Sequence, residues 1–348
     1  MSTDGSGTSR PEWNAFTHEF SSDRGRALLD LGESLAAAGG ALEGLQAAMA
    51  AAETAGTLKD LPTQARAYIQ AAQRHIDLGE QHRARDAFLA AARIWATLLE
   101  WKDQGRALLA AFDAARVAGD HDAGMSADGD DALQEAYTLL LGVEDNHAAA
   151  YAAARLAERE HAKRRRDSAL ELLDQARELA GDDMDLNVLI NNLQADVLID
   201  LERYCCALPL LWQSYDLAES LNAGRHPSFE AWRIVSTLRM SGDLAQAMDL
   251  AQSTLRILHQ TPPADADTFG CIQLEIARIG LAMGDKAGAR VHARKARHHQ
   301  LLADHPAVLA DCEELLRELG ETNTRDHAHE PANSPDTTHT SHMTRGTK

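Results

Sequence analysis

Aromatic residues make up only 5% of this 348-residue sequence, and only nine residues are proline. Residues that break helices or favour strands are therefore sparse. Alanine fills 64 positions, and alanine, leucine, arginine and glutamate all cost little in a helix. The composition predicts an all-α protein. The hydrophobic fraction of 45% is enough for a core, which excludes a globally disordered chain.

Cysteine is also scarce, and its four positions form no CxxC motif. The cysteines are Cys205, Cys206, Cys271 and Cys312. This spacing fits neither a disulfide framework nor a zinc finger, so we expect small residues that pack between helices. A chain without a disulfide pattern suits a reducing compartment. The bias toward alanine and arginine over lysine suggests a bacterial source.

Long apolar runs are missing as well. No window approaches the 18 or so apolar residues of a membrane span. The first twenty residues have neither a basic segment nor the apolar segment of a secretory signal. We therefore expect a cytoplasmic protein with no membrane contact.

The net charge of −19 argues against nucleic acid as a partner, because such surfaces need clustered lysine and arginine. Two local basic groups exist, at residues 163–166 and 290–297. Solvated turns and helix faces explain them more simply than contact with an anionic partner, although both interpretations stay open.

Catalytic and metal-binding motifs are also absent. The sequence contains no GxSxG, HExxH, GxxxxGK[ST] or GxGxxG, so we expect no enzyme and no cofactor. The acidic stretch 120–131 resembles a calcium loop only superficially, because Gly124 and Met125 stand at its fifth and sixth positions. We predict a flexible acidic loop there. No pair among the sixteen histidines has the spacing of a firm helical metal site, so no metal is expected.

Internal repetition is the strongest positive signal. Gly39, Gly79 and Gly119 are 40 residues apart, and Glu202 lies 40 residues before Gly242. Gly284 follows the same pattern. Glycine at the end of a helix allows a left-handed turn, so these positions predict tight turns between paired helices.

Each predicted turn is followed by a stripe of small and apolar residues with the spacing i, i+4, i+7, which lies on one helix face. The stripes begin at Gly44, Ala84, Ala132, Ala169, Ala207, Ala247 and Ala289. Other apolar stripes precede the turns, as at residues 28–35 and 231–238. The pattern predicts seven helix pairs, and residues 306–320 predict one further helix that caps the last pair.

The pattern Leu-Gly…Gly-Asp-x…Ala-x-x-x-[Leu/Phe]-x-x-Ala resembles the tetratricopeptide repeat (TPR). Leu31-Gly32…Gly39 and Ala84-Phe88-Ala91 carry the likeness best. The period of about 40 exceeds the usual 34, as in kinesin light chains and bacterial peptide-sensing regulators. The resemblance implies a right-handed α-α superhelix over residues 22–320. Residues 1–21 and the His-rich tail 321–348 lack apolar periodicity and are expected to be disordered.

The resemblance also implies a binding surface, since first helices line the concave groove in this family. Arg26, Arg66 and Arg106 each precede a turn glycine by thirteen residues, so they occupy equivalent places on three first helices. The lining would continue through Tyr151, Asn192, Trp232, Arg239 and Arg278. Arginine suits bidentate capture of carboxylates, and aromatic residues suit anchoring of apolar side chains. The alternative is that these arginines pair with acids of adjacent helices, such as Asp30 or Asp113.

The function that follows is a non-catalytic scaffold that binds a peptide or protein segment, acidic or ending in a free carboxylate. A sensory regulator is the alternative, in which a small peptide or ligand in the groove alters a partner protein. Residues 1–22 are too short for a DNA-binding helix-turn-helix, so such regulation would act through another protein.

Overall fold

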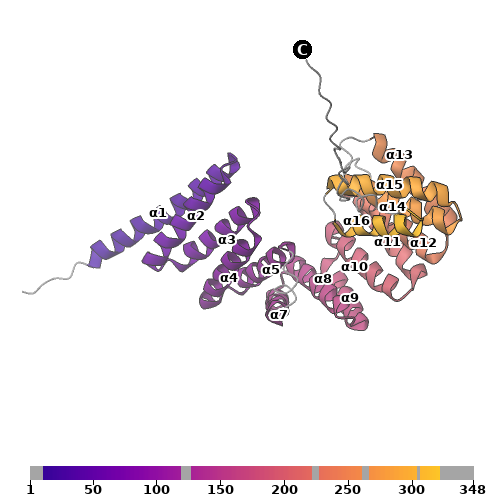
Figure 1. Ribbon diagram of the computed structural model, residues 1–348. Coiled ribbons are helices and arrows are strands. Elements are labelled where there is room, and N and C mark those ends of the chain that lie inside the picture. Colours follow the sequence, from indigo (N-terminus) through magenta and orange to yellow (C-terminus); the bar gives the residue numbers. More distant parts are fainter. Residues whose placement is uncertain (1–10, 119–126, 222–226, 261–265, 304–305, 322–348) are drawn as a thin grey trace, which may run out of the picture. The chain divides into compact units, whose positions relative to one another are not determined.

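The computed structural model describes residues 11–118, 127–221, 227–260, 266–303 and 306–321, with the backbone only for residues 11–22, 127 and 128. Within these ranges it contains fifteen α-helices and no strand (Figure 1). The predicted all-α solenoid of seven helix pairs and a final helix is confirmed. Residues 1–230 and 231–348 form two compact units, which are described separately below.

The described residues of the first unit form ten complete helices. They are α1 (Pro11–Ala37), α2 (Ala41–Leu58), α3 (Leu61–Asp77), α4 (Gln81–Leu98), α5 (Trp101–Val117), α7 (Ala127–Gly142), α8 (Asn146–Ala162), α9 (Arg166–Ala180), α10 (Met184–Asp200) and α11 (Tyr204–Leu221). Each helix packs on the next along the chain, and the first helices α1 and α3 also touch, as do α8 and α10. This contact pattern is that of stacked helix pairs.

The second unit contains the remaining helices. They are α12 (Ser228–Ser241), whose first three residues precede the boundary, α13 (Leu244–Gln260), α14 (Ala266–Ala282), α15 (Lys286–Ala303) and α16 (Pro306–Glu318). Helix α14 is buried over most of its length, between residues 269 and 280. Helix α16 packs on α15 and buries Cys312, Leu315 and Leu316, as predicted for a capping helix.

The turns between paired helices lie where the glycine spacing predicts them. Gly39, Gly79, Gly242 and Gly284 have φ between +75° and +90°, which glycine adopts without strain. At Gly79 the amide donates to Ile76 O, and the next amide donates to His75 O, which satisfies the last carbonyls of α3. Gly119 lies outside the described residues.

Second helices bury the predicted small-residue stripes, with one correction. The stripes that begin at Gly44, Ala84, Ala169, Ala207, Ala247 and Ala289 are buried at all three positions. In α7 the stripe begins at Gly129, not at Ala132, and continues through the buried Leu133 and Ala136. The prediction was wrong because the helix starts at Ala127, inside the segment expected to be a loop.

The acidic stretch 120–131 is therefore helical over its last five residues, and residues 120–126 lie outside the described ranges. Its Asp130 accepts from Arg159 and Lys163, both at 2.7 Å. Burial raises the pKa of Asp130, but the hydrogen bonds and charges of these two partners outweigh it and hold the pKa below the usual value. The acidic side chain is thus a counterion for neighbouring repeats.

The N-terminal segment is also corrected by the structure. Helix α1 begins at Pro11, so residues 11–21 are helical where disorder was expected. Trp13, Phe16 and Phe20 are spaced by three and four residues, which is a helical pattern that the polar composition obscures. Farther along α1, Leu29 is buried and Leu31 exposed, so the predicted stripe at 28–35 is displaced. The stripe at 231–238 is buried as predicted.

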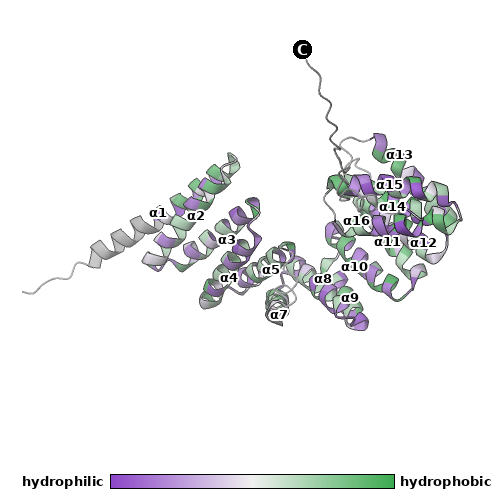
Figure 2. Cartoon of the chain, viewed as in Figure 1, coloured by the Kyte–Doolittle hydropathy of each residue, from purple (hydrophilic) through white to green (hydrophobic). Residues whose placement is uncertain are grey.

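Hydrophobic and hydrophilic residues alternate along most helices, as Figure 2 shows. In the second unit, the apolar face of α15 packs against α14 and α16, and its more polar face is exposed. On that polar face Arg290 donates to the carbonyl of Leu319, and Arg294 donates to Glu321 at 2.9 Å. Basic residues that looked solvated thus hold the end of α16.

Candidate functional site

The three arginines of the predicted binding surface differ in their surroundings. Arg26 is exposed and lies 3.9 Å from Asp23, one turn earlier in α1. Arg66, in α3, is exposed and makes no ion pair or side-chain hydrogen bond with any residue that the structure describes. Arg106, in α5, donates through Nε to Asp145 Oδ2 at 2.7 Å. Pairing with an acid was the alternative, and it holds for Arg106.

Asp145, which precedes α8, explains why Arg106 is bound so closely. Its side chain is only 7% exposed, and Lys102 adds a second positive charge at 3.7 Å. Burial raises the pKa of Asp145, but the hydrogen bond and charge of Arg106 and the charge of Lys102 hold it below its usual value. Arg106 therefore joins two successive first helices, although its side chain remains 54% exposed.

Tyr151, in α8, belongs to a polar cluster on the same first-helix face. Its hydroxyl donates to Asp113 Oδ1 at 3.1 Å and accepts from Arg155 Nη2 at 2.8 Å. Burial, and then the charge of Asp113, raises the pKa of Tyr151. Arg155 also bonds Glu158 at 3.0 Å. Asn192 lies half-buried in α10, and its binding role stays a prediction.

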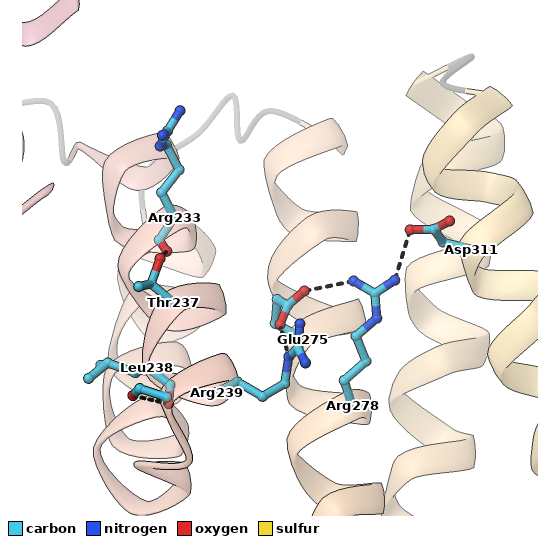
Figure 3. Close-up of polar contacts among 8 residues, drawn as sticks. Arg233, Thr237, Leu238, Arg239, Glu275, Arg278 and Asp311 are labelled. Carbon is cyan, nitrogen blue, oxygen red and sulfur yellow. Dashed lines mark hydrogen bonds and ion pairs between the residues drawn. The ribbon is translucent and has the colours of Figure 1, made fainter. Parts of the chain in front are cut away.

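In the second unit the predicted residues lie in and around an ion-pair network (Figure 3). Glu275, on α14, is only 1% exposed and accepts from Arg239 Nε at 2.6 Å and from Arg278 Nη1 at 2.8 Å. Arg278 Nη2 also donates to Asp311 on α16 at 2.8 Å. Trp232 is half-buried on α12. The two arginines thus link α12, α14 and α16.

A concave pocket in the first unit adds residues that sequence reasoning missed. Its volume is about 240 Å³, and its lining comes from three consecutive helices. The lining residues are Gly32 and Glu33 of α1, Gly44 of α2, and Ile69, Gln70, Gln73 and Arg74 of α3. Ligand pockets usually measure about 300–1,000 Å³, so this one is the size of a side chain and not of a whole ligand.

Close approach of α1 and α2 forms the floor of the pocket. A Cβ on Gly44 would lie 3.0 Å from Gly32 O and 3.3 Å from Arg74 Cδ, so any larger residue would push the helices apart. Above this floor Gln70 Nε2 donates to Glu33 Oε1 at 2.7 Å, and Arg74 pairs with Asp77 at 3.1 Å. Most of the lining surface is apolar, and the polar groups Glu33, Gln70 and Arg74 in the walls are held by their own contacts.

Arg66 and the pocket share one face of α3. Arg66, Gln70 and Gln73 have the spacing i, i+4, i+7, which places them on one side of a helix. Arg26 and Glu33 are seven residues apart on α1, so they share a face in the same way. An exposed guanidinium with no counterion among the described residues thus lies one turn from a side-chain-sized pocket.

Comparison with known proteins gives a likeness at the level of fold. The sequence matches no known family profile and no curated protein. Among solved structures, a tetratricopeptide repeat protein from Parabacteroides merdae covers 86% of this chain and 100% of its own, with a TM-score of 0.59 and 13% identity. The apo form of RapI covers 84% and 99%, with a TM-score of 0.59 and 10% identity.

The chain is built of TPR-like repeats. A third structure, the assembly chaperone of RpL4 (Acl4), covers 76% of this chain and 98% of its own, with a TM-score of 0.53 and 17% identity. At these identities the likeness concerns the fold alone.

Within the TPR-like repeats, the predicted surface residues have different local surroundings. Arg26 and Arg66 lie on the first helices that border the pocket, whereas Arg106 joins α5 to α8. Arg239 and Arg278 lie in the other unit. Glu33 and Gln73 each precede a turn glycine, Gly39 or Gly79, by six residues. This equivalent position in two repeats is the sequence signal from which both could have been predicted as site residues.

The part of the chain that the structure describes contains no group of three or more His, Cys, Asp or Glu side chains arranged to hold a metal ion. In the same ranges no helix is both long enough and apolar enough to span a membrane.

Proposed function

We propose that this chain is a non-catalytic binding protein that holds a peptide or protein segment against the first-helix face of α1 and α3. The observation that carries the proposal is the exposed Arg66, which pairs with no described residue, beside the pocket with its fixed polar groups Glu33 and Gln70. The general use of TPR-like folds in protein binding supports it. No enzyme activity is part of the proposal.

The chemistry of this face favours a segment with a carboxylate and one further polar group. Arg66 can take a carboxylate in a bidentate pair, and Arg26 adds positive charge from the neighbouring first helix. Glu33, Gln70 and Gln73 offer hydrogen-bonding groups to one side chain in the pocket. The carboxylate is an acidic side chain or the end of a chain.

The experiment is a binding screen with defined hexapeptides, each synthesised with a free C-terminal carboxylate and as the amide. We expect peptides with a carboxylate to be retained, and their binding to weaken as salt rises. Arg66→Glu should weaken binding by roughly 10- to 100-fold, the equivalent of losing a charge-assisted hydrogen bond of about 1.5–3 kcal/mol.

Arg93→Glu is the matched control, because Arg93 is an exposed arginine on the second helix α4 that likewise pairs with no described residue. It changes the net charge equally and should leave binding intact. Equal loss in both variants would mean that only overall charge matters, and equal affinity of Arg66→Glu and wild type would remove Arg66 from the site. The sensory alternative predicts, in addition, altered hydrogen exchange far from α1–α3 on peptide binding.

A further inference from the structure

Two adjacent cysteines lie in the first turn of α11, and their thiols are free. Cys205 is exposed and Cys206 half-buried, with 3.9 Å between their Sγ atoms. Arg203 Nη2 lies 3.7 Å from Cys206 Sγ. Burial raises the pKa of Cys271 to about 12 and that of Cys312 to about 11, so these two thiols stay protonated and inert. The accessible thiol chemistry of the described chain is therefore concentrated at one place.

The spacing of the two sulfur atoms suits a shared cation. Thiolates about 2.3 Å from a tetrahedral zinc ion lie about 3.8 Å from each other, which is close to the observed 3.9 Å. A disulfide requires the sulfur atoms at about 2.05 Å and Cα atoms about 4.4–6.8 Å apart, whereas consecutive Cα atoms are only about 3.8 Å apart. The pair can chelate a cation without moving the backbone, but cannot form a disulfide without disturbing α11.

We propose that Cys205 and Cys206 chelate a soft divalent cation of the zinc group. Soft thiolate ligands select such ions. Binding replaces two S–H bonds by two sulfur–metal bonds and releases two protons to solvent for each cation. Arg203 offsets the charge of the second thiolate through its N–H···S contact. Because Cys205 is exposed, water fills the remaining positions of the cation. Sequence reasoning had treated all four cysteines as packing residues.

Titration of the reduced full-length chain with Cd²⁺ tests the site, because cadmium thiolates have an ultraviolet charge-transfer band that imidazole ligands lack. The histidines of the C-terminal tail therefore do not contribute to the signal. We expect one Cd²⁺ per chain, release of two protons, and protection of two thiols from a maleimide. Cys205→Ser and Cys206→Ser should each weaken binding at least tenfold.

Cys312→Ser is the control, since it removes a thiol that is buried against α15 and leaves the start of α11 unchanged. It should keep the full band. A band that persists in the Cys205→Ser/Cys206→Ser double variant, or one lost in Cys312→Ser, would overturn the assignment. A ratio of one cation to two chains would also overturn it, because the cation would then be shared between copies.

Discussion

Glu275 is expected to hold the second unit together through charge, and Glu275→Ala is the change that tests this. The carboxylate is 1% exposed and bonds Arg239 and Arg278, whose side chains are 24% and 30% exposed. Breaking a fully buried ion pair costs about 3–5 kcal/mol. Arg278 keeps Asp311 as a partner, and both arginines retain some contact with water. We therefore expect a loss of about 2–4 kcal/mol.

Glu275→Gln should lie between the alanine variant and wild type, with a loss of about 1–2 kcal/mol, because its amide oxygen still accepts from one guanidinium. Asp311→Asn is the exposed counterpart. Its carboxylate is half exposed, so the loss should be about 0–1 kcal/mol. These three values give an order that a purely steric effect at position 275 would not reproduce, since glutamine and glutamate have nearly the same size.

Hydrogen exchange followed by mass spectrometry is the suitable assay, because repeat arrays often unfold in parts and a single melting temperature can hide a local loss. Amides of α12, α14 and α16 should exchange roughly tenfold faster for each 1.4 kcal/mol lost. Peptides from the first unit serve as the internal reference. If α12, α14 and α16 exchanged at the same rates in Glu275→Ala as in the wild type, the reasoning would be refuted, because the network would then contribute little to stability.

Three further predictions concern packing and pH. Gly105→Ala would place a Cβ 2.8 Å from Leu140 Cγ, so it should destabilise by about 1–2 kcal/mol in urea unfolding, whereas Gly142→Ala meets no atom within 4 Å and should be neutral or slightly stabilising. Four buried alanines lie where paired helices cross, at Ala84, Ala169, Ala207 and Ala289. Replacing any one of them by leucine should lower the free energy of unfolding in urea by about 1–3 kcal/mol. An unchanged free energy in all four variants would mean that the helices cross elsewhere. Burial, and then nearby positive charge, lowers the pKa of His292 and His299. The contribution of the two neutral histidines to stability should be complete above pH about 6.5 and should be lost as the pH falls through their lowered pKa values. The difference between the melting temperatures at pH 7.5 and pH 5.5 should therefore become smaller when both histidines are replaced by glutamine.

Most of the fold could be predicted from the sequence because helix pairing places requirements on residues that are close together in the chain. The left-handed turn favours a glycine, and the close helix crossing favours a small residue five positions later. Gly79 and Ala84 are one such pair. Where another residue adopts the turn, as Arg164 and Glu202 do at φ +63° and +57°, the small residue five positions later still marks the second helix. The pattern fails in the third repeat, where polar residues at the start of α7 hide the helix.

The candidate site was less predictable because pairing between repeats depends on side chains about 40 residues apart. Arg66 and Arg106 occupy equivalent sequence positions, yet only Arg106 meets a buried carboxylate, Asp145. An acidic residue precedes the next first helix in both cases, but Glu100, before α5, is exposed, whereas Asp145, before α8, is buried, and the repeat pattern does not constrain this difference. The pocket was missed for a related reason, since its floor depends on two glycines, Gly32 and Gly44, meeting across helices.

The joints between the successive first helices α1, α3, α5 and α8 are of two kinds, and they should respond differently to load. Hydrogen bonds join α1 to α3 through Gln70 and α5 to α8 through Arg106, and such bonds hold one register. Between α3 and α5 the described side chains form no hydrogen bond or ion pair, and Ala72 of α3 shares an apolar cluster with Ala111 and Ala114 of α5 and with Phe88 of the intervening α4. Apolar contact is non-directional, so we expect this joint to resist shear less than the two hydrogen-bonded joints. A pull on α1 and α8 would therefore be taken up first between α3 and α5, beside the helix that carries Arg66.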